Sequence, residues 1–189
     1  MDDPITTQTE LSSSPPSGEV HSRSFLIYLL ATAVLSGALV MVIQVLGSRV
    51  VGPFFGVSLF VWTSLITVTL LALAGGYAIG GMLADRLQKP AYLFTIILVA
   101  GTLVLFIPIL KGPVLKACLP LGLRGGAFAS TLILFGPVLL LLGCVSPYLV
   151  KLAAREMKNL GRVVGGLYAL STLGSTAGTV LTGFVLIAY

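Results

Sequence analysis

Long uncharged hydrophobic runs are the feature that most limits how this chain can fold. Five such runs, each of 20 residues or more, lie at about 25–46, 59–83, 91–110, 127–150 and 163–188. At 1.5 Å per residue, a helix of about 20 residues crosses the roughly 30 Å hydrocarbon layer of a bilayer. Because backbone amides in lipid must be satisfied within their own segment, continuous runs predict helices and not open strands. We therefore expect an all-α, polytopic transmembrane helix bundle of about five spans.

The composition agrees with lipid as the solvent for most of the chain. Charged residues make up 9% of the sequence and hydrophobic residues 57%, whereas a soluble domain has about 25% charged residues. The exception is the segment 1–24, which is polar and rich in Ser, Thr and Pro. This composition predicts a disordered tail before a bundle that covers 25–189.

The basic residues lie between the hydrophobic runs, so they indicate orientation and contact with lipid head groups, not nucleic-acid binding. Seven of them fall on the side of the N-terminus: Arg23, Arg86, Lys89, Lys151, Arg155, Lys158 and Arg162. Four fall on the other side: Arg49, Lys111, Lys116 and Arg124. This excess of basic residues on the side of the N-terminus predicts that the N-terminus is cytoplasmic. With the hydrophobic runs, we expect a multi-pass protein of the plasma (inner) membrane.

Small residues recur along two of the predicted helices. Ala72, Gly76, Gly80 and Ala84 repeat every four residues, and Gly166, Gly174, Gly178 and Thr182 share one face of the last run. Such stripes let helix backbones approach each other. Plain packing is the first interpretation, and a sliding transporter interface or a homodimer seam is the alternative. In the fourth run, Pro137 and Pro147 each remove a helical hydrogen bond and predict kinks, which can mark gates.

A few polar or aromatic residues are candidates for function. Gln44 is the main strongly polar side chain inside a run, where it predicts an interhelical hydrogen bond or, alternatively, a substrate contact. Trp62 and Tyr148 lie near the ends of runs, as in an interfacial aromatic belt. We expect Cys118, in a loop, and Cys144, in a helix, to be unpaired thiols.

The segment GGMLADRLQKP at 80–90 places Asp85 and Arg86 at a helix end beside a turn. A carboxylate there can accept hydrogen bonds from a neighbouring helix N-terminus or pair with an arginine across the bundle. The segment resembles the loop between the second and third helices of major facilitator transporters, in which Asp and Arg form a cytoplasmic latch. It departs from that pattern at Gln88-Lys89-Pro90.

A wider pattern resembles the membrane-embedded N-terminal domain of the fused, major-facilitator-like spermidine synthases. The first block holds Arg49, Pro53, Phe54, Gly56, Ser58, Phe60, Val61, Trp62 and Thr63. The second consists of VSPYLVKLA at 145–153, with Pro147 and Tyr148, and GRVVGGLYALSTLGSTAGTVLTGFVL at 161–186, with Arg162. The resemblance covers about 25–188 and implies a bundle like half of a major facilitator.

The catalytic part of that family has no counterpart in this sequence. The family's aminopropyltransferase domain binds its substrates with acidic residues, and beyond Ala84 the acids here are Asp85 and Glu156. We also find no nucleophile–base pair, no metal-ligand set and no phosphate loop. We therefore expect no catalytic, cofactor-binding or metal-binding residues.

Two functions remain as hypotheses. The first is a non-catalytic membrane module that anchors or assists a separate aminopropyltransferase-like enzyme or a membrane complex. The second is a small transporter of polyamines or other small metabolites, which would work as an oligomer because five spans are fewer than a transporter of this kind needs. Membrane lipid and either a second copy or another membrane protein are the expected partners.

Overall fold

The computed structural model describes residues 19–87, 90–156 and 160–187. Within this part there are five α-helices and no strand, which confirms the all-α prediction. The helices are α1 (Glu19–Phe55), α2 (Leu59–Arg86), α3 (Pro90–Cys118), α4 (Gly122–Glu156) and α5 (Leu160–Leu181). A 3₁₀ turn, η1 (Leu119–Leu121), joins α3 to α4, and a π-helical turn, η2 (Thr182–Leu186), follows α5.

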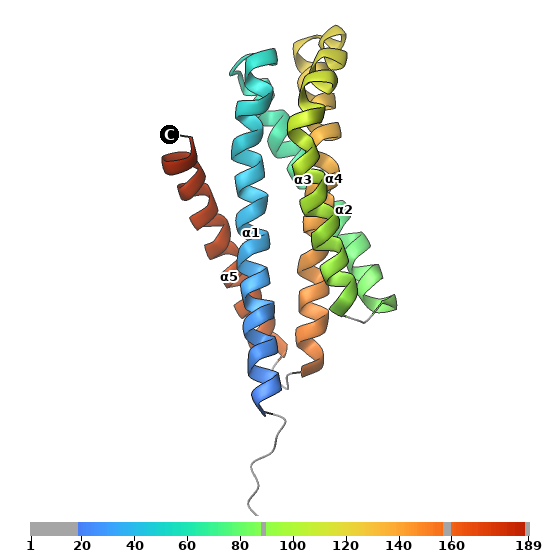
Figure 1. Cartoon of the computed structure of the whole chain (residues 1–189), viewed down its shortest axis with the longest axis vertical. Helices are drawn as coiled ribbons and strands as arrows, with labels where there is room; N and C mark the ends of the chain where they lie inside the picture. The colour runs from blue at the N-terminus through green and yellow to red at the C-terminus, as the bar shows by residue number, and fades with distance from the viewer. Residues whose placement is uncertain (1–18, 88–89, 157–159, 188–189) are drawn as a thin grey trace, which may run out of the picture.

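Within the described residues, four stretches are long and apolar enough to cross a membrane, compared with the five predicted. They are Phe25–Phe55, Leu59–Arg86, Pro90–Ala153 and Gly161–Leu186. The third has 64 residues because it contains α3, η1 and α4. As one straight helix it would be about 96 Å long, roughly three times the hydrocarbon thickness. Instead the chain reverses at η1, and α3 packs alongside α4 (Figure 1).

The helices extend beyond the hydrophobic runs that predicted them. The segment 47–58 was predicted as a loop, but α1 continues through Arg49 and Pro53 and ends at Phe55. The turn lies instead at Gly56, which has a φ of 79° that favours glycine. The predicted loop at 111–126 is also largely helical, and Cys118 is a buried residue at the end of α3. The end of a hydrophobic run indicates where the hydrocarbon layer ends. The helix itself can continue further, because its backbone hydrogen bonds do not depend on hydrophobic side chains.

The predicted polar tail falls largely on residues 1–18, which lie outside the described residues. The first helix begins at Glu19, before the first hydrophobic residue of the run. Helix α4 remains one helix across Pro137 and Pro147.

Helix α4 lies at the centre of the bundle and packs against each of the other four helices. Both hydrophobic clusters of the core use its side chains, one around Phe135 and Leu139 and the other around Val145 and Leu149. Helix α5 packs mainly on α1, and Figure 1 shows it diverging from the bundle toward its C-terminal end. The bundle therefore consists of a compact group around α4 and an outer pair formed by α1 and α5.

The small residues of α2 lie in close contact with α4, as the packing interpretation predicts. A Cβ atom on Gly80 would lie 2.5 Å from the Cα of Cys144, and one on Gly76 would lie 2.8 Å from the Cα of Gly143. These distances leave no room for a side chain. The two backbones therefore touch directly over these turns, which glycine alone allows.

A second close contact joins α5 to α1. A Cβ atom on Gly178 would lie 2.7 Å from the carbonyl oxygen of Ala38, and one on Gly174 would lie 2.9 Å from the Cα of Val34. Gly166, predicted on the same face, has open space around it. The seam therefore covers the middle and C-terminal part of α5 and not its beginning.

Neighbouring glycines on α2 provide a matched test of this packing. We expect Gly80→Val to lower the free energy of unfolding by about 1–3 kcal/mol, because the new side chain would overlap the α4 backbone. Gly81→Val should have little effect, since a Cβ there meets nothing within 4 Å. Thermal unfolding of both variants in mild detergent measures the difference. Equal destabilisation by the two substitutions would contradict a direct α2–α4 contact.

Candidate functional site

A partly open cavity of about 200 Å³ lies between α1, α2, α4 and α5. Its lining residues sit about halfway along each of these helices, which places the cavity near the middle of the bundle's long axis. They are Ser36, Gly37, Val40, Met41, Leu73, Tyr77, Leu142, Ser146, Tyr168, Ser171, Thr172 and Ser175. Seven of these twelve residues have a side chain that ends in a hydroxyl group, so the cavity has a partly polar lining near the middle of the bundle.

Several of these hydroxyl groups already donate their proton to the backbone. Ser36 Oγ donates to the carbonyl oxygen of Ala33 at 3.1 Å, and Thr172 Oγ1 donates to that of Tyr168 at 2.9 Å. Ser175 Oγ lies 3.0 Å from the carbonyl oxygens of both Gly37 and Ser171. Each hydroxyl oxygen keeps lone pairs that can accept a further hydrogen bond. These three side chains therefore present acceptors to the cavity.

Two tyrosines stand at the open side of the cavity. Tyr77 on α2 is 49% exposed and Tyr168 on α5 is 55% exposed. Both line the cavity while keeping about half of their surface uncovered by the described chain. The opening therefore faces outward between α2 and α5.

Within the described part of the chain, no charged side chain lines the cavity. Among the described residues there is also no group of three or more His, Cys, Asp or Glu that could hold a metal ion. Serine, threonine and tyrosine hydroxyls without a neighbouring base are suited to hydrogen bonding and not to acid–base or nucleophilic chemistry. The arrangement can bind and orient a polar group.

A second polar arrangement joins the end of α2 to α4. Lys151 Nζ lies 2.6 Å from Asp85 Oδ1, so the carboxylate pairs with a lysine of α4. The pair is exposed, with 45% and 66% of the two side chains accessible. Beside it, the hydroxyl of Tyr148 donates to the carbonyl oxygen of Leu87. These two contacts hold the turn after α2 against α4.

Tyr148 is not part of an interfacial aromatic belt, because it is 1% exposed and lies in the core cluster with Val145 and Leu149. Its neighbour Pro147 packs close to Gly80 of α2. The predicted residues Asp85, Pro147 and Tyr148 are thus brought together at one end of the α2–α4 contact.

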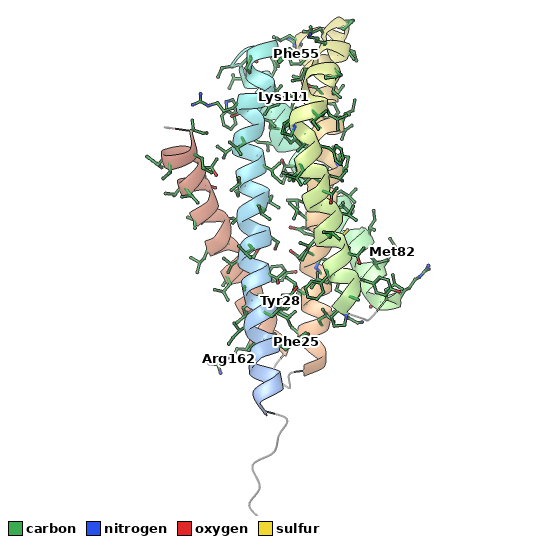
Figure 2. All side chains as sticks on the ribbon, viewed as in Figure 1. Phe25, Tyr28, Phe55, Met82, Lys111 and Arg162 are labelled. Atoms are coloured by element: carbon green, nitrogen blue, oxygen red, sulfur yellow. The ribbon has the colours of Figure 1, made fainter. Side chains whose placement is uncertain are left out.

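Arg86 lies between Asp85 and Leu87 of this end contact, and the remaining predicted residues lie apart from it and from the cavity. Arg49 is exposed in α1, Gln44 is partly buried in the same helix, and Trp62 is 42% exposed in the first turns of α2. Arg86 is exposed at the end of α2, and Arg162 is exposed near the start of α5. Figure 2 places Arg162 and Phe25 toward one end of the bundle and Phe55 at the other.

At that other end, a cation–π contact joins α4 to α2. The guanidinium carbon of Arg124 lies 4.5 Å from the centroid of the Phe60 ring. The α2–α4 pair is therefore fixed near both ends by polar or aromatic contacts and in between by glycines.

The sequence did not predict the cavity. The hydroxyl residues of its lining, among them Ser36, Ser171 and Ser175, were not grouped as a site. Hydroxyl groups contribute little to hydropathy, so they leave a run looking uniformly apolar. The sequence feature that could have predicted the cavity is that hydroxyl residues recur at a similar depth in four hydrophobic runs.

Comparison with family models, with curated proteins and with solved structures found no match to this chain.

The contacts at the end of α2 predict unequal effects of two substitutions. Tyr148→Phe should lower the free energy of unfolding by about 0.5–1.5 kcal/mol, because it leaves a carbonyl without its donor. Lys151→Gln should cost less, about 0–1 kcal/mol, since the ion pair is exposed to solvent. Tyr92→Phe, at an exposed position of α3, is the control. Chemical or thermal unfolding in detergent would contradict this ranking if Lys151→Gln were the most harmful.

Proposed function

We propose that this chain is a non-catalytic module of the plasma membrane that crosses the bilayer five times and binds a separate protein there. In this topology α3 and α4 cross separately, and the N-terminus is cytoplasmic. The Asp85–Lys151 ion pair supports it, because the charge count assigns both residues to the same side. The bundle would then correspond to half of a major facilitator, as the sequence resemblance implies.

The open side of the cavity is the observation that carries this proposal. A hydroxyl group that faces acyl chains finds hydrogen-bond partners only within the protein, and polar groups in a membrane usually face other helices. Tyr77 and Tyr168 lie at this opening and are half exposed. A transmembrane helix of a partner would cover the opening and shield the hydroxyl groups from lipid.

The sequence resemblance suggests what the partner does. In the fused spermidine synthases, a membrane domain of this kind is attached to an aminopropyltransferase. By analogy, the partner would be an aminopropyltransferase-like enzyme with its own membrane segment, or a component of a membrane complex. A second copy of this chain is the other candidate for the same position.

Photo-crosslinking at the opening tests the proposal. A photoreactive phenylalanine analogue in place of Tyr168 should form a specific adduct with a protein in native membranes. The same analogue in place of Leu105, which is 76% exposed on α3, is the control and should react mainly with lipid. Mass spectrometry of the adduct distinguishes a second copy from a different protein. Lipid adducts alone at both positions would reject the proposal.

A small oligomeric transporter is the second candidate function, and the position of the cavity halfway along four helices favours it. Transporters bind their cargo near the bilayer midplane. The uncharged lining favours a neutral metabolite over a polyamine, because a polyamine cation needs carboxylates. Reconstituted vesicles that accumulate neither labelled polyamines nor labelled neutral metabolites would count against transport.

The proposed orientation can be measured by thiol labelling. In a background with Cys118→Ala and Cys144→Ala, we expect Arg86→Cys to react with an impermeant maleimide from the cytoplasmic side. Lys116→Cys should react from the opposite side, because α3 separates the two positions. Right-side-out and inverted vesicles provide the two arms of the experiment. Labelling of both cysteines from one side would contradict five crossings.

A further inference from the structure

We infer that the hydroxyl-lined cavity is a binding site for a small, uncharged molecule that carries N–H or O–H groups, such as a short polyol or amide. This inference goes beyond the proposed partner, because the site belongs to this chain whichever protein covers its opening. It is carried by the hydrogen-bonding state of the lining, the volume of the cavity and its lack of charge.

The hydrogen-bonding state indicates a ligand that donates. The protons of Ser36, Thr172 and Ser175 are directed to backbone carbonyl oxygens. Their oxygen lone pairs remain available, and they come from α1 and α5, two helices that pack against each other. A ligand with several N–H or O–H groups satisfies such acceptors, whereas an acyl chain would leave them without partners.

The volume limits the ligand to a few heavy atoms. A cavity of about 200 Å³ is smaller than the roughly 300–1,000 Å³ typical of sites for drug-sized molecules. It corresponds to about seven water molecules at roughly 30 Å³ each. A three- or four-carbon polyol fits within this space, whereas a disaccharide would extend out through the opening.

The lack of charge excludes ions of either sign as the best ligand. No Asp, Glu, Lys or Arg of the part of the chain that the structure describes lines the cavity. An ion at this depth without a counter-charge is costly in a membrane. The phenol groups of Tyr77 and Tyr168 at the rim can both donate and accept, so they suit the hydroxyl or amide groups of a neutral ligand.

Protection of a cysteine placed in the cavity tests the site, with glycerol as the probe. In the protein without Cys118 and Cys144, Ser146→Cys puts a thiol in the lining, and N-ethylmaleimide alkylates it. At about twice its dissociation constant, bound glycerol should slow alkylation about threefold by mass action. Sucrose at the same concentration should have no effect. Leu98→Cys on the exposed face of α3 should be insensitive to both.

A further substitution tests whether protection of the thiol by glycerol depends on a residue of the cavity lining. Ser36→Ala removes an acceptor without breaking a bond between helices, because Ser36 donates within α1. It should weaken protection by glycerol, measured as the ratio of the alkylation rates with and without glycerol in the same variant. If Ser146→Cys does not fold, Thr172→Cys reports on the same cavity.

Three results would overturn the inference: no effect of glycerol, equal effects of glycerol and sucrose, or full protection in the Ser36→Ala variant. The partner proposal is tested separately. If Tyr168 gives lipid adducts alone while glycerol still protects the cavity thiol, the partner is rejected and the ligand site stands.

Discussion

The direct contact between the backbones of α2 and α4 is the interaction on which the rest of the bundle depends. In lipid, helices gain little from removing apolar surface from water, so close packing and polar contacts must hold them together. Gly76 and Gly80 provide the close packing, since any side chain there would overlap α4. Because α4 also contacts α1, α3 and α5, its position relative to α2 fixes the other helices.

The cavity lies between two pairs of helices, and close glycine contacts join the two helices of each pair. One seam joins α2 to α4 and the other joins α5 to α1, and α5 diverges from the bundle beyond its seam (Figure 1). Between the two pairs, small hydroxyl residues occupy positions where large apolar side chains would fill the space. The same Ser171 and Ser175 that let α5 approach α1 also line the cavity. Packing and the candidate site therefore share residues.

The sequence predicted the helical class, the approximate positions of the helices and the packing role of Gly76 and Gly80. It failed at the helix ends, because a hydrophobic run ends where water begins while the hydrogen bonds of α1 continue to Phe55. It also misplaced Tyr148, since its position near the end of a run does not reveal that the ring points inward. The cavity depends on hydroxyl groups from four helices, and their convergence is a property of the tertiary fold.

The α1–α5 seam has a consequence for how the protein is made. The hydroxyl of Ser175 and the carbonyl of Gly37 are 138 positions apart in the chain, yet they form one hydrogen bond. During synthesis α1 enters the bilayer long before α5 exists. The surface of α1 that later contacts α5 therefore first faces lipid or the insertion machinery. Domains of nascent chains fold in order of emergence, but this pair can form only late. Assembly of the bundle is therefore completed after translation of α5.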